Sequence, residues 1–150
     1  MIGWLLDTNV IAELSRRSAE PRVAAWASAQ PEDALFISVL TLAEYDKGIA
    51  ALPDNLPERA RFAAAAAALE ARFRGRILSV GDRVVRRWGV VSGTVKRRIG
   101  HPPPVIDTLL AASAIEHRLY LATRNTRDVE HSGAVAFNPW TDDPARFPLE

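Results

Sequence analysis

Three acidic residues far apart in the chain, Asp7, Glu44 and Asp107, are of the type from which an enzyme could build a cation site. Asp7 follows the short apolar run Trp4–Leu6, which predicts a buried strand, and it precedes a predicted helix. In open α/β sheets ligands bind at the carboxyl ends of the strands, so an acid at this point is a candidate metal ligand. If the fold brings Glu44 and Asp107 to the same place, the three carboxylates form a site for a hard cation.

Each of these acids also has an ordinary structural explanation. An aspartate directly before a helix, such as Asp7, serves as an N-cap that accepts hydrogen bonds from free backbone N–H groups. Thr41, Glu44 and Lys47 share one side of a predicted helix, which is typical of a polar stripe facing solvent. Asp107 lies in the first turn of a predicted helix, where a negative charge complements the helix dipole. Taken singly, the acids therefore leave both explanations open.

The surroundings of Asp107 and a further polar group favour the cation site. The apolar neighbours Val105 and Ile106 indicate that Asp107 is buried, and a buried acid needs a partner such as a cation. After the fourth predicted strand, Asn125 and Asp128 offer a neutral and a charged oxygen donor. Clustered carboxylates repel one another and therefore bind Mg²⁺ or Mn²⁺ well. Such ions activate water and stabilise the charge that develops when a phosphodiester is cleaved.

The composition restricts the class of protein. The chain has 150 residues, 48% of them hydrophobic, which predicts one domain with a substantial core. It has no cysteine, which excludes disulfides, cysteine–zinc sites and thiol nucleophiles, and its three histidines lack metal-ligand spacing. No apolar run is long enough to span a membrane and no signal peptide is recognisable, so we expect a cytoplasmic protein without a membrane partner. Six basic residues and no acid lie between positions 83 and 98, a pattern typical of a solvated helix face or of phosphate binding.

Short apolar runs alternate with segments of helical spacing along the chain. Strands are predicted at residues 3–6, 34–38, 76–80, 120–123 and 135–137, and helices at residues 8–17, 21–29, 39–51, 57–73, 82–98 and 105–117. This alternation predicts an α/β fold, with a mostly parallel central sheet flanked by helices on both faces. We expect one domain over residues 1–140 and a proline-containing C-terminal tail over residues 141–150.

Five short motifs resemble those of the PIN-domain ribonucleases, and within that family the VapC-type and FitB-type toxins of bacterial toxin–antitoxin pairs. They are Leu5–Ile11, Ser38–Glu44, Val105–Ala112, Ala122–Asn125 and Phe137–Trp140. Any one of them is a loose match, but together they follow the order of the family across residues 4–140. The resemblance implies a single PIN-like nuclease domain.

The resemblance also implies an activity, a cofactor and partners. Members of this family hold Mg²⁺ or Mn²⁺ on a rim of acids and cleave RNA, and their first three acids fall on Asp7, Glu44 and Asp107, of which we expect Asp7 and Asp107 to bind the metal. Many members have a fourth acid where this chain has Asn125, so we expect Asp128 to take that catalytic role. The expected supporting polar residues are Thr8, Asn9, Thr123 and Asn125. A homodimer bound by a cognate VapB/FitA-type antitoxin is the implied assembly, and the residues that bind RNA are left unassigned.

Two other functions are compatible with the sequence. Phosphatases of the haloacid-dehalogenase type also have an aspartate after the first strand, but they need a second acid two residues later, where this chain has Asn9. A catalytically silent PIN fold that only binds RNA or protein is the other alternative, and the amide at Asn125 is its best support. Incubation with RNA and Mg²⁺ distinguishes the three: the first function gives RNA cleavage, the second phosphate-monoester turnover, and the third binding without a metal requirement.

Overall fold

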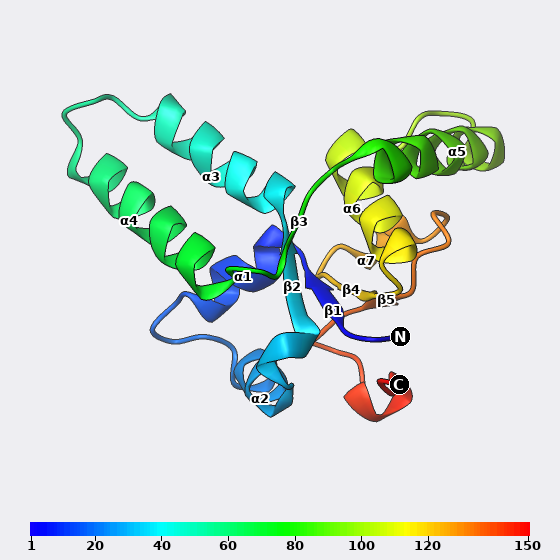
Figure 1. Cartoon of the computed structure of the whole chain (residues 1–150), viewed down its shortest axis with the longest axis horizontal. Helices are drawn as coiled ribbons and strands as arrows, with labels where there is room; N and C mark the ends of the chain where they lie inside the picture. The colour runs from blue at the N-terminus through cyan, green and yellow to red at the C-terminus, as the bar shows by residue number, and fades with distance from the viewer.

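The computed structural model describes all 150 residues and has a central sheet of five parallel strands in the order β3-β2-β1-β4-β5 (Figure 1). The strands are β1 (Trp4–Leu6), β2 (Leu35–Ser38), β3 (Ile77–Leu78), β4 (Tyr120–Ala122) and β5 (Ala136–Phe137). β1 pairs with β2 on one side and with β4 on the other, so the strand that ends just before Asp7 is the middle of the sheet. The predicted α/β class with a parallel central sheet is confirmed.

Seven α-helices connect and cover the strands. They are α1 (Thr8–Leu14), α2 (Pro21–Ala29), α3 (Val39–Ala51), α4 (Pro57–Arg72), α5 (Asp82–Ile99), α6 (Val105–Glu116) and α7 (Thr126–Val129), with 3-10 turns at Glu32–Ala34 and Pro144–Arg146. The six predicted helices are all present, but α1 ends three residues earlier than expected, because residues 15–20 carry no large apolar side chain that could extend its buried face. The short α7 was not predicted, since a single turn of four residues is too short to show a helical period.

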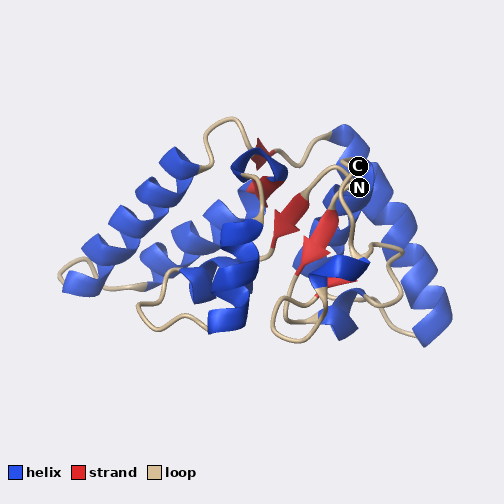
Figure 2. Cartoon of the chain, turned by 90° about the horizontal axis from the view of Figure 1, so that it is seen from below, coloured by secondary structure: helices blue, strands red, loops and turns tan.

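Helices cover both faces of the sheet, which Figure 2 shows from below. Successive side chains of a strand point to opposite faces, so Trp4 and Leu6 enter one apolar cluster and Leu5 enters the other. The first cluster includes residues of α1 and α2, and the second is built mainly on α6. The unbroken apolar run of β1 therefore reflects a strand that is buried on both sides.

The C-terminal residues pack against the same core. Phe147 lies 4.9 Å from Phe137 and 5.3 Å from Tyr120 between ring centroids, within a cluster of aromatic rings around Trp4. The Tyr120 hydroxyl donates to the carbonyl of Pro148 at 3.0 Å. The last residue, Glu150, forms an ion pair with the amino group of the first residue. The segment 141–150 thus has little regular structure but is held against the domain.

Two helical pairs extend from the body of the molecule as separate arms (Figure 1). One arm is formed by α3 and α4, and the other by α5 and α6. The carboxyl ends of β1 and β2 point to the side on which the two arms diverge. The α3–α4 arm is thinly packed: α4 has no buried residue and α3 has only Thr41. No helix combines the length and the apolar character needed to cross a bilayer.

The close approach of Gly3 to the neighbouring strand generates a prediction about stability. A Cβ atom at Gly3 would lie 2.4 Å from the carbonyl oxygen of Ala34, an overlap that only a backbone shift can relieve. We expect Gly3→Ala to lower the free energy of unfolding by about 1–3 kcal/mol, measured by urea denaturation. Gly48→Ala is the matched control, because Gly48 lies within α3 with open space around it. This control should be neutral or stabilising by up to about 1 kcal/mol; equal effects of the two substitutions would contradict the packing argument.

Candidate active site

The Asp7 carboxylate lies at the end of β1 and is almost fully buried, at 8% exposure. It caps α1 as expected, since its Oδ1 accepts a hydrogen bond of 2.7 Å from the backbone N–H of Thr8. Its Oδ2 accepts two more, from the Thr123 hydroxyl at 2.7 Å and from the Asn9 side-chain amide at 3.0 Å. Asp7 is therefore both the N-cap of α1 and a residue at the carboxyl edge of the sheet.

Thr8 connects this carboxylate to Glu44 on the α3–α4 arm. The Thr8 hydroxyl donates to the Glu44 carboxylate, and it also lies 3.3 Å from the hydroxyl oxygen of the buried Thr41. α3 starts directly after β2 with Ser38 as its N-cap, whose hydroxyl accepts from the N–H of Leu40. The β1–α1 and β2–α3 junctions thus bring their polar side chains to the same edge of the sheet.

Asp107 lies in the first turn of α6, as predicted, and is half-buried. The expectation that Val105 and Ile106 bury its surroundings is wrong, because these side chains are 55% and 39% exposed. The next residue, Thr108, is the buried one in this turn, with no exposed surface. Its hydroxyl donates to the Pro104 carbonyl at 2.7 Å and accepts from the indole N–H of Trp88 on α5 at 3.1 Å, which fixes the start of α6.

The charges around Asp107 show that the predicted acids come together. Burial, and after it the negative charges of Asp7, Asp128 and Glu44, raise the pKa of the Asp107 carboxyl from 3.8 to about 6. Every charged group that shifts this pKa is an acid, so no Lys or Arg compensates the charge of Asp107. Four acids, from the β1–α1 junction and from α3, α6 and α7, therefore share one electrostatic environment at the carboxyl edge of the sheet.

The polar residues after β4 complete this edge. Thr123, at 1% exposure, donates to Asp7 and accepts from the backbone N–H of Asn125 at 3.0 Å. The Asn9 side-chain oxygen accepts from the backbone N–H of Arg124 at 3.1 Å, which ties α1 to the same loop. Asn125 and Asp128 are both exposed, and of the two only the charge of Asp128 acts on Asp107.

The donor chemistry of this edge suits a hard divalent cation. The side chains here offer carboxylate, hydroxyl and amide oxygens, which such a cation prefers, and no basic group compensates the charge of Asp107. As the side chains are placed, however, no three His, Asp or Glu groups in the chain reach a common point. Binding an ion here therefore requires acidic side chains to turn toward one another.

Sequence reasoning missed three contributors to this geometry. Thr41 was noted only as part of a polar stripe, yet it is fully buried beside the Thr8 hydroxyl. Thr108 and Trp88 were not predicted, because their hydrogen bond joins two helices whose relative placement is a tertiary property. A threonine directly after an acid in a first helical turn is a weak local signal that could have found Thr108.

The raised pKa of Asp107 predicts a pH-dependent stability in the absence of metal. Because its pKa rises from 3.8 to about 6 on folding, the protonated form favours the folded state. The charged form therefore costs stability above about pH 6, and this cost is absent below about pH 4. We expect Asp107→Asn to raise the Tm by a few degrees in EDTA at about pH 8 and to change it little at about pH 4. Asp46→Asn, an exposed acid farther along α3, should show no such pH dependence, and a gain at low pH only would contradict the sign.

Known proteins are similar to this chain over nearly its whole length. The PIN domain family matches residues 4–132. Toxin FitB of Neisseria gonorrhoeae is 31% identical over 138 residues, covering 92% of this chain and 99% of the relative. The VapC ribonuclease Y4jK of Sinorhizobium fredii is 31% identical over 136 residues, covering 91% of this chain and 96% of the relative.

The fold is similar as well. The solved structure of FitAcB from Neisseria gonorrhoeae matches with a TM-score of 0.80 at 30% identity, over 91% of this chain and 98% of that one. Both the family match and the fold therefore agree with the resemblance drawn from the sequence. The chain belongs to the PIN-domain family, and within it to the VapC/FitB type of toxin.

Proposed function

We propose that this protein is a Mg²⁺- or Mn²⁺-dependent endoribonuclease and the toxin of a type II toxin–antitoxin pair. The observation that carries the proposal is the shared electrostatic environment of Asp7, Glu44, Asp107 and Asp128 at the carboxyl edge of a parallel sheet. In α/β folds this edge is where ligands bind. The similarity to a protein named a VapC ribonuclease supports RNA as the substrate.

Asp7 and Asp107 would hold the cation, with Glu44 and Asp128 as further acidic contacts. Their oxygens are the donors that Mg²⁺ and Mn²⁺ prefer. A cation bound there supplies Lewis-acid stabilisation for the negative charge that develops on a phosphodiester. The proposal requires the acids to close by side-chain rotation, since no three of them reach a common point as placed.

The residues around Asp7 have a positioning task in this proposal. The Thr8 N–H, the Asn9 amide and the Thr123 hydroxyl all donate to its carboxylate, so they hold it in one orientation. The Thr8 hydroxyl fixes the Glu44 carboxylate at the same time. A preorganised negative group of this kind needs little rearrangement when it binds a cation.

An antitoxin of the VapB/FitA type is the proposed inhibitor, and a homodimer is the proposed assembly. Solved structures of similar chains are described as FitAB bound to a DNA fragment and as VapBC-1 from nontypeable Haemophilus influenzae. The uncompensated acids also favour a basic inhibitory group, because an arginine guanidinium pairs bidentately with carboxylates. Such a side chain would take the place of the cation and block RNA at once.

A catalytically silent PIN fold is the second candidate. Two observations favour it: Asn125 provides an amide where many family members have an acid, and the acids as placed do not enclose an ion. Such a protein would bind its partner or RNA without a metal requirement. Cleavage assays with and without EDTA distinguish the two functions.

The nuclease proposal predicts a large effect of neutralising Asp7. Asn at this position can still cap α1 but carries no charge, so Asp7→Asn should reduce cleavage of RNA in Mg²⁺ by about a hundredfold or more while the protein stays folded. Cleavage is measured on a labelled RNA, and folding by circular dichroism and Tm. Asp46→Asn makes the same chemical change at an exposed site on α3 and should retain activity. A well-folded Asp7→Asn protein with full activity would refute the proposal.

A further prediction distinguishes Asp128 from Asn125. A carboxylate attracts a hard cation more strongly than an amide does, so Asp128→Ala should raise the Mg²⁺ concentration needed for half-maximal cleavage several-fold. Asn125→Ala removes a side chain of similar size and exposure from the same loop region after β4. This substitution should change the required concentration by less than about twofold, as expected for a surface position. A larger effect at Asn125 would reverse the assignment.

A further inference from the structure

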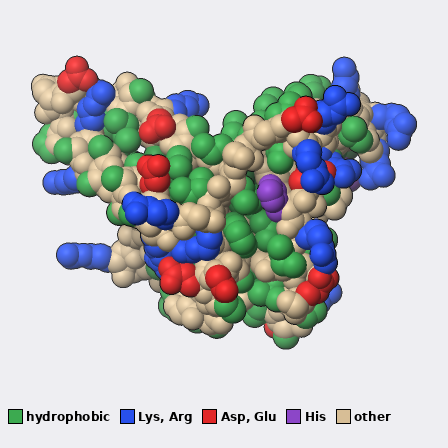
Figure 3. Space-filling model, in the orientation of Figure 1, with side chains coloured by type: hydrophobic (Ala, Val, Ile, Leu, Met, Phe, Trp, Pro, Cys, Tyr) green, Lys and Arg blue, Asp and Glu red, His purple; other side chains and the backbone are tan.

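The charge of α5 is unlike that of the rest of the chain. The helix carries six basic residues against the single acid Asp82, a net charge of +5 in a protein whose total is +1. The remaining residues are therefore net negative. Figure 3 shows Lys and Arg side chains gathered over the α5 arm.

Most of these basic residues share one face of the helix. Val84, Val91 and Val95 form the buried face. Arg97 and Arg98 follow Arg86 and Arg87 by eleven residues, which is about three helical turns and returns them to the same side. The two pairs are separated by about 16 Å along the helix axis at 1.5 Å per residue. We call the exposed face that carries Arg83, Arg86, Arg87, Arg97 and Arg98 the arginine face.

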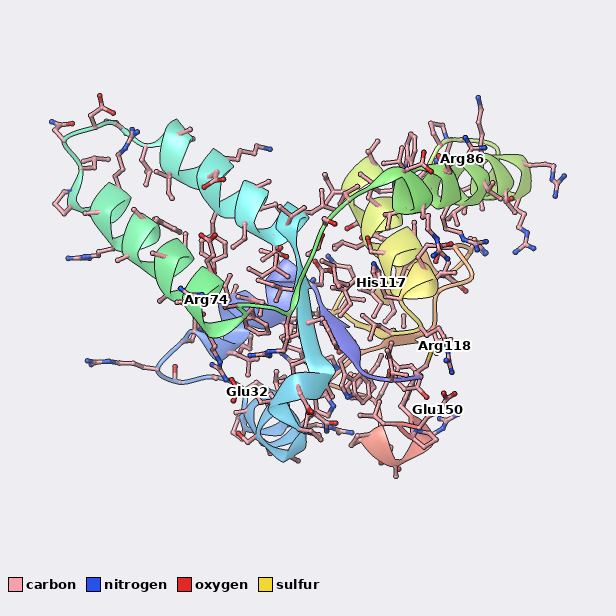
Figure 4. The ribbon with its side chains drawn as sticks, in the orientation of Figure 1. Glu32, Arg74, Arg86, His117, Arg118 and Glu150 are labelled. Carbon is pink, nitrogen blue, oxygen red and sulfur yellow. The ribbon has the colours of Figure 1, made fainter.

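Part of the arginine face is paired, but most of its charge is free. Arg83 and Arg87 form ion pairs with Glu116 at 3.2 Å and 2.6 Å. Arg86, Arg97 and Arg98 are exposed and have no ion-pair partner in the structure. Arg86 lines a shallow depression with Arg83 and Arg87, and Figure 4 shows Arg86 projecting from α5. The face thus offers three uncommitted guanidinium groups to an external anion.

The direction of α5 places Arg97 and Arg98 on the same side of the molecule as Asp107, whereas Arg83 and Arg87 lie at the other end of α6, beside Glu116. Arg83 contacts Glu116 at the end of α6, whereas Trp88, five residues later on α5, contacts Thr108 near the start of α6, so the two helices run antiparallel. The last turn of α5 must then lie toward the end of α6 that carries Asp107. Only the loop of residues 100–104 separates the two helices in the chain.

We propose that the arginine face binds the phosphate backbone of single-stranded RNA and guides the strand that leaves the acidic edge. The inference rests on the proposed nuclease function and assigns the RNA-binding surface that the sequence left open. A nucleic-acid backbone carries one negative charge per nucleotide along a line, which complements guanidinium groups spread along about 16 Å of one helix face. The charges of an acidic protein segment would be spaced less regularly. Binding of such a segment is an alternative that the experiment distinguishes.

The test measures RNA binding apart from cleavage. The Asp7→Asn protein is titrated into a fluorescent single-stranded RNA of about 20 nucleotides, longer than the stretch that one such groove covers, and anisotropy is followed over a range of salt concentrations. Replacing Arg86, Arg97 and Arg98 together by Ala should weaken binding about tenfold or more and reduce the slope of log Kd against log salt by about 2. The corresponding triple change to Lys should keep most of the affinity, since the charge is retained.

The control is a triple Ala substitution of Arg17, Arg61 and Arg74, three exposed arginines outside the α5 arm that remove the same total charge. This variant should keep the salt slope within about one unit of the parent, because it removes no phosphate contact. An equal loss of RNA affinity in both triple variants would overturn the proposal, because the effect would then come from the net charge of the protein and not from the arginine face. Tighter binding of duplex DNA or of an acidic peptide, with the same dependence on the arginine face, would overturn it in favour of that partner.

Cleavage kinetics separate this inference from the proposed function. In a protein with Asp7 intact, the arginine-face triple variant should raise KM for the long RNA about tenfold and leave kcat nearly unchanged, because the substituted groups bind the strand in both ground and transition states. If the unsubstituted protein cleaves no RNA, the nuclease function fails, while the anisotropy result still decides whether the face binds RNA.

Discussion

The hydrogen bonds to the Asp7 carboxylate connect the parts of the candidate site. One oxygen caps α1, and the other accepts from Thr123 after β4 and from Asn9. Hydrogen bonds to a charged acceptor contribute about 1.5–3 kcal/mol each, which offsets the cost of holding a carboxylate at the end of a buried strand. Thr8 also donates to Glu44, so the residue next to Asp7 joins the α3–α4 arm to the β1–α1 junction. Loss of the Asp7 carboxylate would therefore disturb several side chains at the carboxyl edge of the sheet, not Asp7 alone.

Asp107, by contrast, opposes folding when its carboxyl is charged. Burial, and after it the negative charges of Asp7, Asp128 and Glu44, raises the pKa of Asp107, so its charged form is less favourable in the folded protein than in the unfolded chain. The hydrogen bond between Trp88 and Thr108 keeps the start of α6 in place against this repulsion. Any cation that binds the folded state is then stabilising, whether it is a metal ion or a basic side chain of a partner. The repulsion between these acids therefore lowers the stability of the folded protein and also favours the binding of a positive ligand.

Most of the fold and the identity of the acids could be predicted, because both depend on local patterns. The apolar run of β1 followed by Asp7 indicates a strand end, and parallel strand ends meet at one edge. The environment of each acid could not be predicted. Val105 and Ile106 are apolar yet exposed, although they begin a helix whose later residues are buried. Which residues of this first turn are buried depends on how α5 packs against α6, as the hydrogen bond between Trp88 and Thr108 shows, and no local pattern records that packing.

The net charge of +1 hides two opposite surfaces, and their separation has a consequence for the proposed nuclease. On the proposed function, RNA would be repelled by the acidic edge and attracted by the arginine face, so affinity for the strand would arise away from the position where a bond would be broken. A cation at the edge then has to remove the repulsion before a phosphate approaches Asp7 and Asp107. Binding should accordingly respond to salt through α5, and cleavage to divalent cations through the acids. An inhibitor that neutralises the edge with a basic side chain can stop cleavage while leaving the arginine face free, which separates control of the reaction from the capture of RNA.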